Sequence, residues 1–301
     1  MNRKVDLCGV TLNNPVMTAS GTFGSGAEYA EFVDLNKLGA VVTKGVANVP
    51  WPGNPTPRVA EVYGGMLNAV GLQNPGIDLF VERDIPFLKQ FDTKIMVNVC
   101  GHSTEEYIEV VERLRDQPVD LLEINISCPN VKEGGIAFGQ DPKAVEAITK
   151  EMKKHAAQPV IMKLSPNVTD ITEMARAAEA GGADGLSLIN TITGMKIDIN
   201  RQKFVLANKT GGMSGPAIHP VAVRMVYQTA QAVRLPIVGM GGIMNAEDAI
   251  EMILAGATAV SVGTANFTNP HVTEEIVAGI RDYMERYQVA DIRDLVGAVH
   301  E

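Results

Sequence analysis

The chain has 301 residues, of which 46% are hydrophobic and 20% charged, an ordinary balance for a globular enzyme. This length fits either two ordinary domains or one large α/β domain with insertions. The formal net charge of −9 excludes nucleic acid as the expected partner, because binding to a phosphate backbone needs a basic surface.

Short apolar runs alternate along the chain with longer amphipathic stretches, a pattern typical of parallel strands whose outer face is covered by helices. The predicted strands are, in chain order, Pro15–Ser20, Ala40–Lys44, Ile95–Val99, Leu121–Asn125, Val160–Leu164, Gly185–Asn190, Ile237–Met240 and Ala259–Gly263. The helices predicted between them are Thr104–Arg115, Pro142–His155, Asp170–Ala180, Pro220–Val233 and Ala246–Ala255. Eight such units predict an α/β fold of the (β/α)8 TIM-barrel class, built as a single domain from residues 1–301. A doubly wound sheet is the alternative architecture.

Two connections are too long to be simple turns. They are Gly45–Lys94 after the second predicted strand and Thr191–Pro236 after the sixth. Long ordered connections usually serve function, and connections that follow barrel strands emerge on the active-site face. We therefore expect both insertions to form walls or lids of a substrate site.

Polar residues or glycines stand at or beside the C-terminal end of every predicted strand. In chain order they are Ser20, Lys44, Asn98, Asn125, Lys163, Asn190, Gly241-Gly242 and Gly263-Thr264. A single Lys or Asn at a strand end is ordinarily part of a solvated loop. Because all such ends meet at one face of a barrel, the whole set predicts a ring of hydrogen-bonding groups around one cavity.

Glycines after the last two predicted strands indicate a phosphate site. Gly241-Gly242 and Gly263 occupy the positions where barrel loops and a following helix N-terminus bind phosphate, and Gly215 adds a further backbone donor. Glycine by itself also serves in tight turns, so the prediction depends on both positions together. The GxGxxG spacing of a dinucleotide fingerprint is missing, and no nicotinamide-dinucleotide site is expected in this chain.

The cysteines Cys8, Cys100 and Cys128 lie far apart and cannot form a paired framework, which favours a reducing compartment. They form no CxxC pair, and the five histidines show neither HxH nor HExxH spacing, so no iron–sulfur cluster and no metal site are expected. The N-terminal segment lacks a signal-peptide pattern, and no apolar run approaches the ~20 residues that span a bilayer. We expect a cytoplasmic protein without a membrane anchor, whose fold begins almost at its first residue.

Cys128 differs from the other two cysteines, which we interpret as small buried hydrophobic residues. A predicted strand ends at Asn125, and the chain then turns through Cys128-Pro129, which directs the thiol toward the barrel mouth. Polar neighbours such as Asn125 and Asn130 argue against a purely apolar environment. A thiol in such surroundings can act as a base or nucleophile once its pKa is lowered, so Cys128 is the predicted catalytic residue.

These motifs resemble those of the dihydroorotate dehydrogenases along essentially the whole chain. The matching segments are Thr18–Gly21, Thr43–Gly45, Asn68–Asn74, Asn98, Asn125–Asn130, Lys163, Asn190-Thr191, Gly241-Gly242 and Gly263-Thr264. The resemblance implies an FMN-containing barrel that oxidises dihydroorotate to orotate in pyrimidine biosynthesis. Cysteine as the base is typical of the cytosolic class 1 enzymes, whereas the membrane-bound class 2 enzymes carry serine and an N-terminal extension.

Within class 1, the segments Asn68–Gly76 and Leu188–Asp198 resemble class 1B. In that class the catalytic chain works with an iron–sulfur flavoprotein subunit that carries FAD and a 2Fe-2S cluster, and NAD+ is the final acceptor. The resemblance therefore implies a heterotetramer of two catalytic and two electron-transfer chains around a catalytic homodimer. The residues agree with this arrangement, because a flavin enzyme without a nicotinamide site or cluster cysteines must pass its electrons to something outside the chain.

The resemblance also implies which residues act. Cys128 would remove the C5 proton of dihydroorotate while FMN accepts the C6 hydride. The implied FMN contacts are Ser20, Lys44, Gly45, Asn98, Asn125, Lys163, Ile189, Gly215, Gly241, Gly242, Gly263 and Thr264. The implied substrate contacts are Lys44, Asn68, Ala69, Val70, Gly71, Leu72, Asn125, Asn130, Asn190 and Thr191. Amides suit a pyrimidine edge because they offer both donor and acceptor, and a cation at Lys163 would stabilise the anionic reduced flavin.

Three other functions remain open at this point. A class 1A-like enzyme would use fumarate as the acceptor. A flavin enzyme of the dihydropyrimidine dehydrogenase type shares the barrel and a catalytic cysteine, although Asn130 after Cys128-Pro129 favours dihydroorotate. A phosphate-binding lyase with a Schiff base on Lys163 belongs to a different class.

Overall fold

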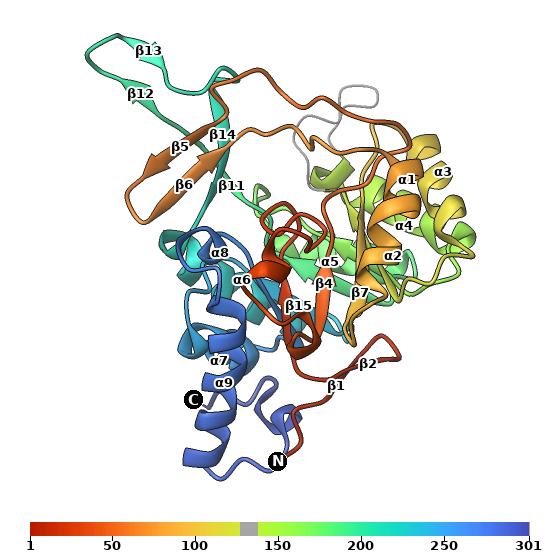
Figure 1. Ribbon diagram of the computed structural model, residues 1–301, viewed down its shortest axis with the longest axis vertical. Helices are drawn as coiled ribbons and strands as arrows, with labels where there is room; N and C mark the ends of the chain where they lie inside the picture. The colour runs from red at the N-terminus through yellow and green to blue at the C-terminus, as the bar shows by residue number, and fades with distance from the viewer. Residues whose placement is uncertain (127–137, 301) are drawn as a thin grey trace.

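The structure, a computed structural model, describes residues 1–126 and 138–300. In this part of the chain, eight parallel strands close into a barrel in the order β10-β15-β16-β3-β4-β7-β8-β9 (Figure 1). Their bounds are β3 Val16–Thr18, β4 Ala40–Val42, β7 Lys94–Val99, β8 Leu121–Asn125, β9 Val160–Lys163, β10 Gly185–Leu188, β15 Ile237–Met240 and β16 Ala259–Val262. The closed barrel confirms the predicted (β/α)8 class and excludes the doubly wound sheet. Each strand lies within two residues of its predicted bounds.

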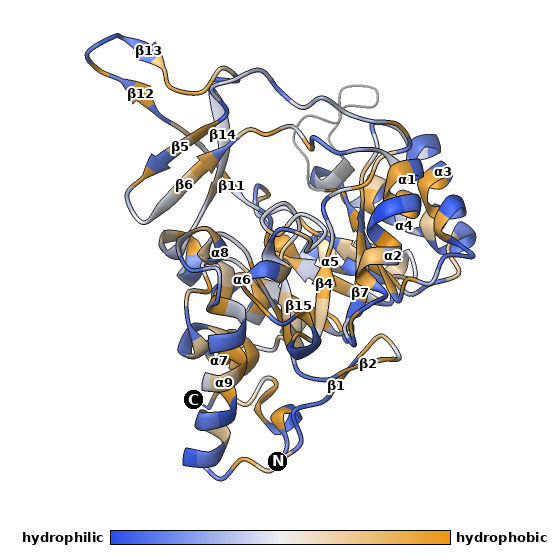
Figure 2. Cartoon of the chain, in the orientation of Figure 1, coloured by the Kyte–Doolittle hydropathy of each residue, from blue (hydrophilic) through white to orange (hydrophobic). Residues whose placement is uncertain are grey.

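Helices surround the barrel and present their apolar sides to it. The longer ones are α3 Thr104–Leu114, α4 Pro142–His155, α5 Ile171–Ala180, α6 His219–Ala232, α7 Ala246–Leu254 and α9 Val272–Arg286. Short helices α1 Ile77–Leu79, α2 Ile85–Leu88 and α8 Ala265–Thr268 lie in the connections. Figure 2 shows the division of these helices into a hydrophilic and a hydrophobic side. Among the described residues, no helix combines the length and the apolar character needed to cross a membrane.

Side-chain caps explain where the helices begin. The Ser103 hydroxyl accepts a hydrogen bond from the Glu106 N–H at the start of α3, and Asn245 accepts one from the Asp248 N–H at the start of α7. Each cap satisfies a backbone donor that has no partner inside the helix, and the acidic residues behind it face the positive end of the helix dipole.

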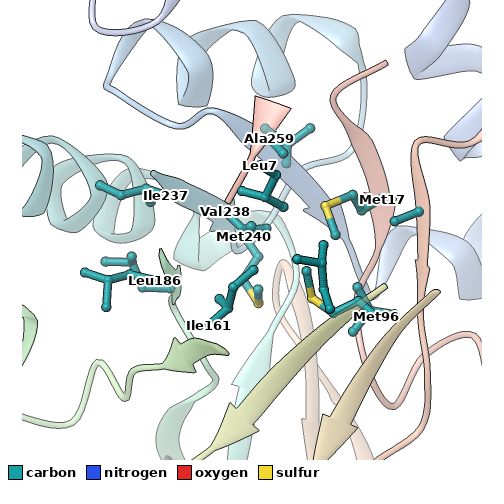
Figure 3. Close-up of a cluster of buried hydrophobic side chains, with 14 of the residues drawn as sticks. Leu7, Met17, Met96, Ile161, Leu186, Ile237, Val238, Met240 and Ala259 are labelled. Carbon is teal, nitrogen blue, oxygen red and sulfur yellow. The ribbon is translucent and has the colours of Figure 1, made fainter. Parts of the chain in front are cut away.

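The barrel interior is packed with aliphatic and methionine side chains (Figure 3). Met17, Met96, Ile161 and Val238 are fully buried within it. The strands β1 Val5–Leu7 and β2 Val10–Leu12 form an antiparallel hairpin outside the barrel sheet, and the buried Leu7 lies in the cluster with the barrel residues. The hairpin therefore closes the end of the barrel opposite the strand C-termini, where side chains serve stability.

The two long insertions meet in one small sheet. The first contains β5 Val59–Val62 and β6 Gly65–Asn68, and the second contains β11 Ile192–Met195, β12 Ile197–Asp198, β13 Lys203–Phe204 and β14 Thr210–Ser214. Pairing of β6 with β14 joins them in a four-stranded sheet of order β11-β14-β6-β5, while β12 and β13 form a separate hairpin (Figure 1). Two segments far apart in the sequence thus make one structure above the barrel.

Candidate functional site

A cavity of about 430 Å³ lies at the C-terminal ends of the barrel strands, as predicted. Barrel residues form its floor, and the small sheet of the two insertions forms its wall. The predicted site residues that line it are Ser20, Lys44, Asn68, Ala69, Val70, Gly71, Leu72, Asn125, Lys163, Ile189, Asn190, Thr191, Gly215, Gly241, Gly242, Gly263 and Thr264. The predicted walls therefore come from both insertions, Asn68–Leu72 from the first and Thr191 and Gly215 from the second.

Two predicted residues, Gly45 and Asn98, do not line this cavity and lie directly behind it. Asn98 is fully buried at the end of β7. Its side-chain oxygen accepts a hydrogen bond from the Asn125 amide at 3.4 Å, and a Cβ on Gly45 would lie 3.0 Å from the same oxygen. Asn98 therefore supports the cavity floor through Asn125, and Gly45 lies against Asn98.

Cys128 and Asn130 lie outside the described residues. The structure describes the strand that leads to them, with Asn125 at its end on the cavity floor. The backbone carbonyl of Asn125 accepts a hydrogen bond of 2.7 Å from the buried Tyr107 hydroxyl. The catalytic role of Cys128 thus stays a prediction from the sequence.

Two lysines bring positive charge to the cavity. Lys44 follows β4, and a Cβ on Gly21 would lie 3.8 Å from its Nζ. Lys163 ends β9, and its Nζ lies 3.3 Å from a carboxylate oxygen of Glu123. Ammonium groups placed at a cavity wall favour a ligand that carries negative charge.

Glu123 is a residue that the sequence prediction missed. It is fully buried in β8 and has hydrogen-bond partners on both of its carboxylate oxygens. The sequence contains a signal for it, because a charged residue inside the apolar run Leu121–Asn125 is rare in a buried strand unless it is paired.

The glycines of the predicted phosphate end are required by the packing. Gly242 has φ +69, and a Cβ on it would lie 2.7 Å from the Gly215 carbonyl oxygen and 2.8 Å from Cβ of His219. Gly215 has φ +111, and a Cβ on it would lie 2.5 Å from the Gly65 Cα. The Thr264 hydroxyl completes this end with a 2.7 Å hydrogen bond to the Ser214 hydroxyl. Backbone N–H groups in such a glycine cradle can approach anionic oxygens closely.

His219 fixes this glycine loop from behind. Its Nδ1 lies 2.8 Å from the Gly241 carbonyl oxygen, which requires that Nδ1 carry the proton and donate. Its Nε2 lies 3.1 Å from Glu251 and 4.0 Å from Asp248. These three residues bring potential metal-ligand atoms within 4.8 Å of one another in the described part of the chain. Asp248 also accepts a hydrogen bond from the Met244 N–H, so it serves the start of α7 as well.

The amide side of the cavity contains one further residue that the sequence prediction missed. Asn167 lines the cavity beside Thr191. Its Nδ2 donates to the Thr191 carbonyl at 3.0 Å, and its Oδ1 accepts from the Thr193 N–H at 2.9 Å. Asn167 therefore holds the start of the second insertion against the barrel.

Cys8 and Cys100 lie away from this chemistry. Cys100 is fully buried, as predicted for a small hydrophobic residue. The same prediction was wrong for Cys8, which is only partly buried because it lies in the turn of the β1–β2 hairpin. This partial burial raises the pKa of its thiol to about 12, with the nearby Asp184 and Asp6 carboxylates adding to the shift. A thiol with this pKa stays protonated at neutral pH and is a poor nucleophile.

A closed barrel with one polar cavity at its strand C-termini defines this chain as an enzyme of the (β/α)8-barrel class. Residues 3–284 match the family described as Dihydroorotate dehydrogenase, and the chain belongs to that family.

Its relatives include two proteins named "Dihydroorotate dehydrogenase B (NAD(+)), catalytic subunit". The one from Lachnoclostridium phytofermentans is 72% identical over 299 residues, covering 99% of this chain and 100% of the relative. The one from Alkaliphilus metalliredigens is 64% identical over 299 residues, covering 99% of each chain. The similarity thus extends over essentially the whole of both relatives.

Proposed function

We propose that the protein is the catalytic chain of an NAD+-linked dihydroorotate dehydrogenase and oxidises (S)-dihydroorotate to orotate in the synthesis of UMP. The observation that carries this proposal is a single cavity that combines a glycine cradle, two lysines and a row of amide side chains. Each of these groups can bind one part of a flavin mononucleotide or of a pyrimidine carboxylate. The names and the full-length similarity of the relatives support the same function.

FMN fits the residues present. The cradle of Gly215, Gly241 and Gly242 admits no Cβ, which suits close approach by phosphate oxygens, and Thr264 contributes a hydroxyl beside it. Lys163 lines the cavity on the barrel side, where it would face the flavin ring. When bound, FMN supplies the acceptor for the hydride from C6 of dihydroorotate.

The substrate is assigned to the side of the cavity formed by Lys44 and the amides. Lys44 provides a cation for the carboxylate of dihydroorotate, and Asn68, Asn125 and Asn190 provide donors and acceptors for its ring edge. Cys128 follows Asn125 by three positions in the sequence, and we propose it as the base that removes the C5 proton. Enclosure by the two insertions would keep water away from the reacting atoms.

The electrons are proposed to leave through another chain. The relatives are named as catalytic subunits of an enzyme that uses NAD(+). We propose a partner subunit with FAD and a 2Fe-2S cluster, in a heterotetramer of two catalytic and two electron-transfer chains around a catalytic homodimer. The cytoplasmic location expected from the sequence stays a prediction.

The visible spectrum of the purified protein tests this function. We expect flavin absorbance that bleaches when dihydroorotate is added without oxygen, and release of FMN on denaturation. A colourless protein would contradict the proposal. Bleaching by dihydrouracil or dihydrothymine but not by dihydroorotate would favour the dihydropyrimidine dehydrogenase type instead.

The Schiff-base lyase is disfavoured by a contact in the structure. A lysine that forms a Schiff base attacks as a neutral amine. Lys163 is buried in an ion pair with Glu123 instead. Borohydride treatment in the presence of substrate should therefore leave the mass of the chain unchanged.

A further inference from the structure

Glu123 is a buried anion placed one layer behind the cavity. Glu123 is 0% exposed, whereas its partner Lys163 lines the cavity. The two residues come from the neighbouring strands β8 and β9, in which Asn125 pairs with Lys163. The negative charge of Glu123 is thus separated from the cavity by the positive charge that it pairs with.

The contacts of this carboxylate come from three barrel strands, β7, β9 and β10, which neighbour or follow its own strand β8. One oxygen accepts from the Asn98 amide at 2.5 Å and lies 3.3 Å from Lys163 Nζ, and the other accepts from the Ser187 hydroxyl at 2.7 Å. Asn98 lies opposite Glu123 on β7, and Ser187 lies opposite Lys163 on β10. Since all three partners are buried, their positions are determined by the barrel itself.

Lys163 depends on Glu123 for its position. Within the described residues, the Glu123 carboxylate is the hydrogen-bond partner of its Nζ. An ammonium group has three donors, so this bond leaves donors for a ligand in the cavity. A long flexible side chain is therefore anchored at its charged end, on the side away from the cavity.

Stability alone does not account for this pair. Removing two charges from water is costly, and apolar residues of similar volume are often at least as stabilising in such positions. The layer of the barrel below is made of such residues, including Met96 and Ile161. A charged pair placed where the packed core meets the cavity therefore points to a function at the cavity.

We propose that Glu123 is a positioning residue that anchors Lys163 and balances its charge, and thereby sets the reduction potential of the flavin. This inference rests on the proposed function, since it requires FMN in the cavity. With Glu123 in place, the pair beside the flavin is neutral overall. Without the carboxylate, the ammonium charge is unbalanced and stabilises the negative charge that accumulates on reduction.

The test uses the purified flavoprotein with the substitution Glu123→Gln. Glutamine fits the same contacts, because its oxygen can accept from Asn98 and Lys163 while its amide donates to the Ser187 hydroxyl. We expect the equilibrium constant for flavin reduction to rise at least tenfold, which is about 30 mV for a two-electron couple. The potential is measured by equilibration with reference dyes, and FMN binding by titration of the apoprotein.

A double-mutant cycle with Lys163→Met tests whether Glu123 acts through Lys163. In the Lys163→Met chain, Glu123 has no ammonium group to position or to balance. If Glu123 acts through Lys163, Glu123→Gln should change the potential much less in this background than in the wild-type background. Ser187→Ala is the matched control, since it removes a hydrogen bond of Glu123 without changing the charge.

Several results would overturn the proposal. An unchanged potential in Glu123→Gln would do so, as would an equal shift in the Lys163→Met background. Loss of FMN binding in Glu123→Gln would show that Glu123 supports only the shape of the site. If that variant does not fold, Glu123→Asp, which draws the charge back from Lys163, must shift the potential upward by a smaller amount.

The wild-type protein separates this inference from the proposed function. Wild-type protein that holds FMN and is bleached by dihydroorotate, beside an unshifted Glu123→Gln variant, would overturn the inference alone. Wild-type protein without flavin would overturn both.

Discussion

At the scale of single residues, Gly242 belongs to the proposed phosphate cradle for FMN. A Cβ at this position would collide with Gly215 and with the start of α6. We expect Gly242→Ala to weaken FMN binding by about tenfold or more, since backbone strain of this kind costs roughly 1–3 kcal/mol. Titration of the apoprotein with FMN, followed by flavin fluorescence, measures the change.

Gly182→Ala provides the matched control for this substitution. Gly182 also has a positive φ, of +89, but the nearest atom to a Cβ there is Lys153 Cγ at 3.9 Å. This variant carries the backbone cost without the collision and without contact with the cavity. Equal FMN affinities in the two alanine variants would contradict the assignment of Gly242 to the phosphate cradle.

Cys128 is the residue on which the proposed chemistry depends. Replacing it with Ala should remove most turnover and leave FMN bound, because a base is lost and the glycine cradle is untouched. Cys128→Ser should be impaired and should improve as the pH rises, since a hydroxyl is a weaker acid than a thiol. Steady-state rates between pH 6 and 10 check both variants, with Cys100→Ala as the control. Near-normal turnover in Cys128→Ala at neutral pH would exclude this base.

Residues at strand ends could be predicted from the sequence, whereas those behind them could not. Lys163 and Asn125 follow apolar runs, and barrel geometry alone places them at one face. His219 lies near the start of a predicted helix, and its contact with the Gly241 carbonyl spans 22 positions. No periodicity in the sequence encodes a contact of that kind, because it depends on how two loops pack.

At the scale of elements, the hairpin β1–β2 closes the end of the barrel opposite the active site. Its turn contains Cys8, whose thiol has a pKa raised from 9.0 to about 12 by burial. Below pH 9 the thiol is protonated in both folded and unfolded chains. Between pH 9 and 12 only the unfolded chain loses the proton, so the free energy of unfolding falls as the pH rises.

The variant Cys8→Ala tests this contribution. By pH 10 the free energy of unfolding of the wild-type protein should have fallen by roughly 1.4 kcal/mol, a loss that the variant does not show. This pH lies one unit above the ordinary thiol pKa of 9.0, and one unit corresponds to that energy. Urea unfolding at pH 8, 9 and 10 measures the free energy of unfolding of both proteins, and each protein is compared with its own value at pH 8. Parallel pH profiles for the two proteins would contradict a partly buried thiol that stays protonated in the folded chain.

The small sheet above the barrel shows where prediction from the sequence stops. The barrel strands are apolar along their whole length because both faces are covered, and this makes them recognisable. The strands β6 and β14 are partly exposed and rich in glycine, and their pairing brings Asn68 within 3.4 Å of Gly212, which lies 144 positions away. Insertions could be predicted as cavity walls from their length, but their union in one sheet depends on pairing that the sequence alone does not show.

At the scale of the whole molecule, the destination of the electrons separates the two class 1 alternatives. The chain alone should be reduced by dihydroorotate without forming NADH, because it lacks a dinucleotide fingerprint. Adding the purified electron-transfer subunit should start NADH formation at a rate that saturates with that subunit. Absorbance at the NADH band, with both proteins handled without oxygen, measures this.

Fumarate is the decisive control for that experiment. A class 1A-like enzyme would be reoxidised by fumarate with no second protein, because a small acceptor can enter the cavity that the substrate leaves. Rapid reoxidation of the reduced chain by fumarate would therefore contradict the NAD+-linked assignment. Slow reoxidation by fumarate together with fast reoxidation through the partner would require an electron path from the flavin to the protein surface. Glu123→Gln should slow electron transfer along this path, because it raises the reduction potential of the flavin.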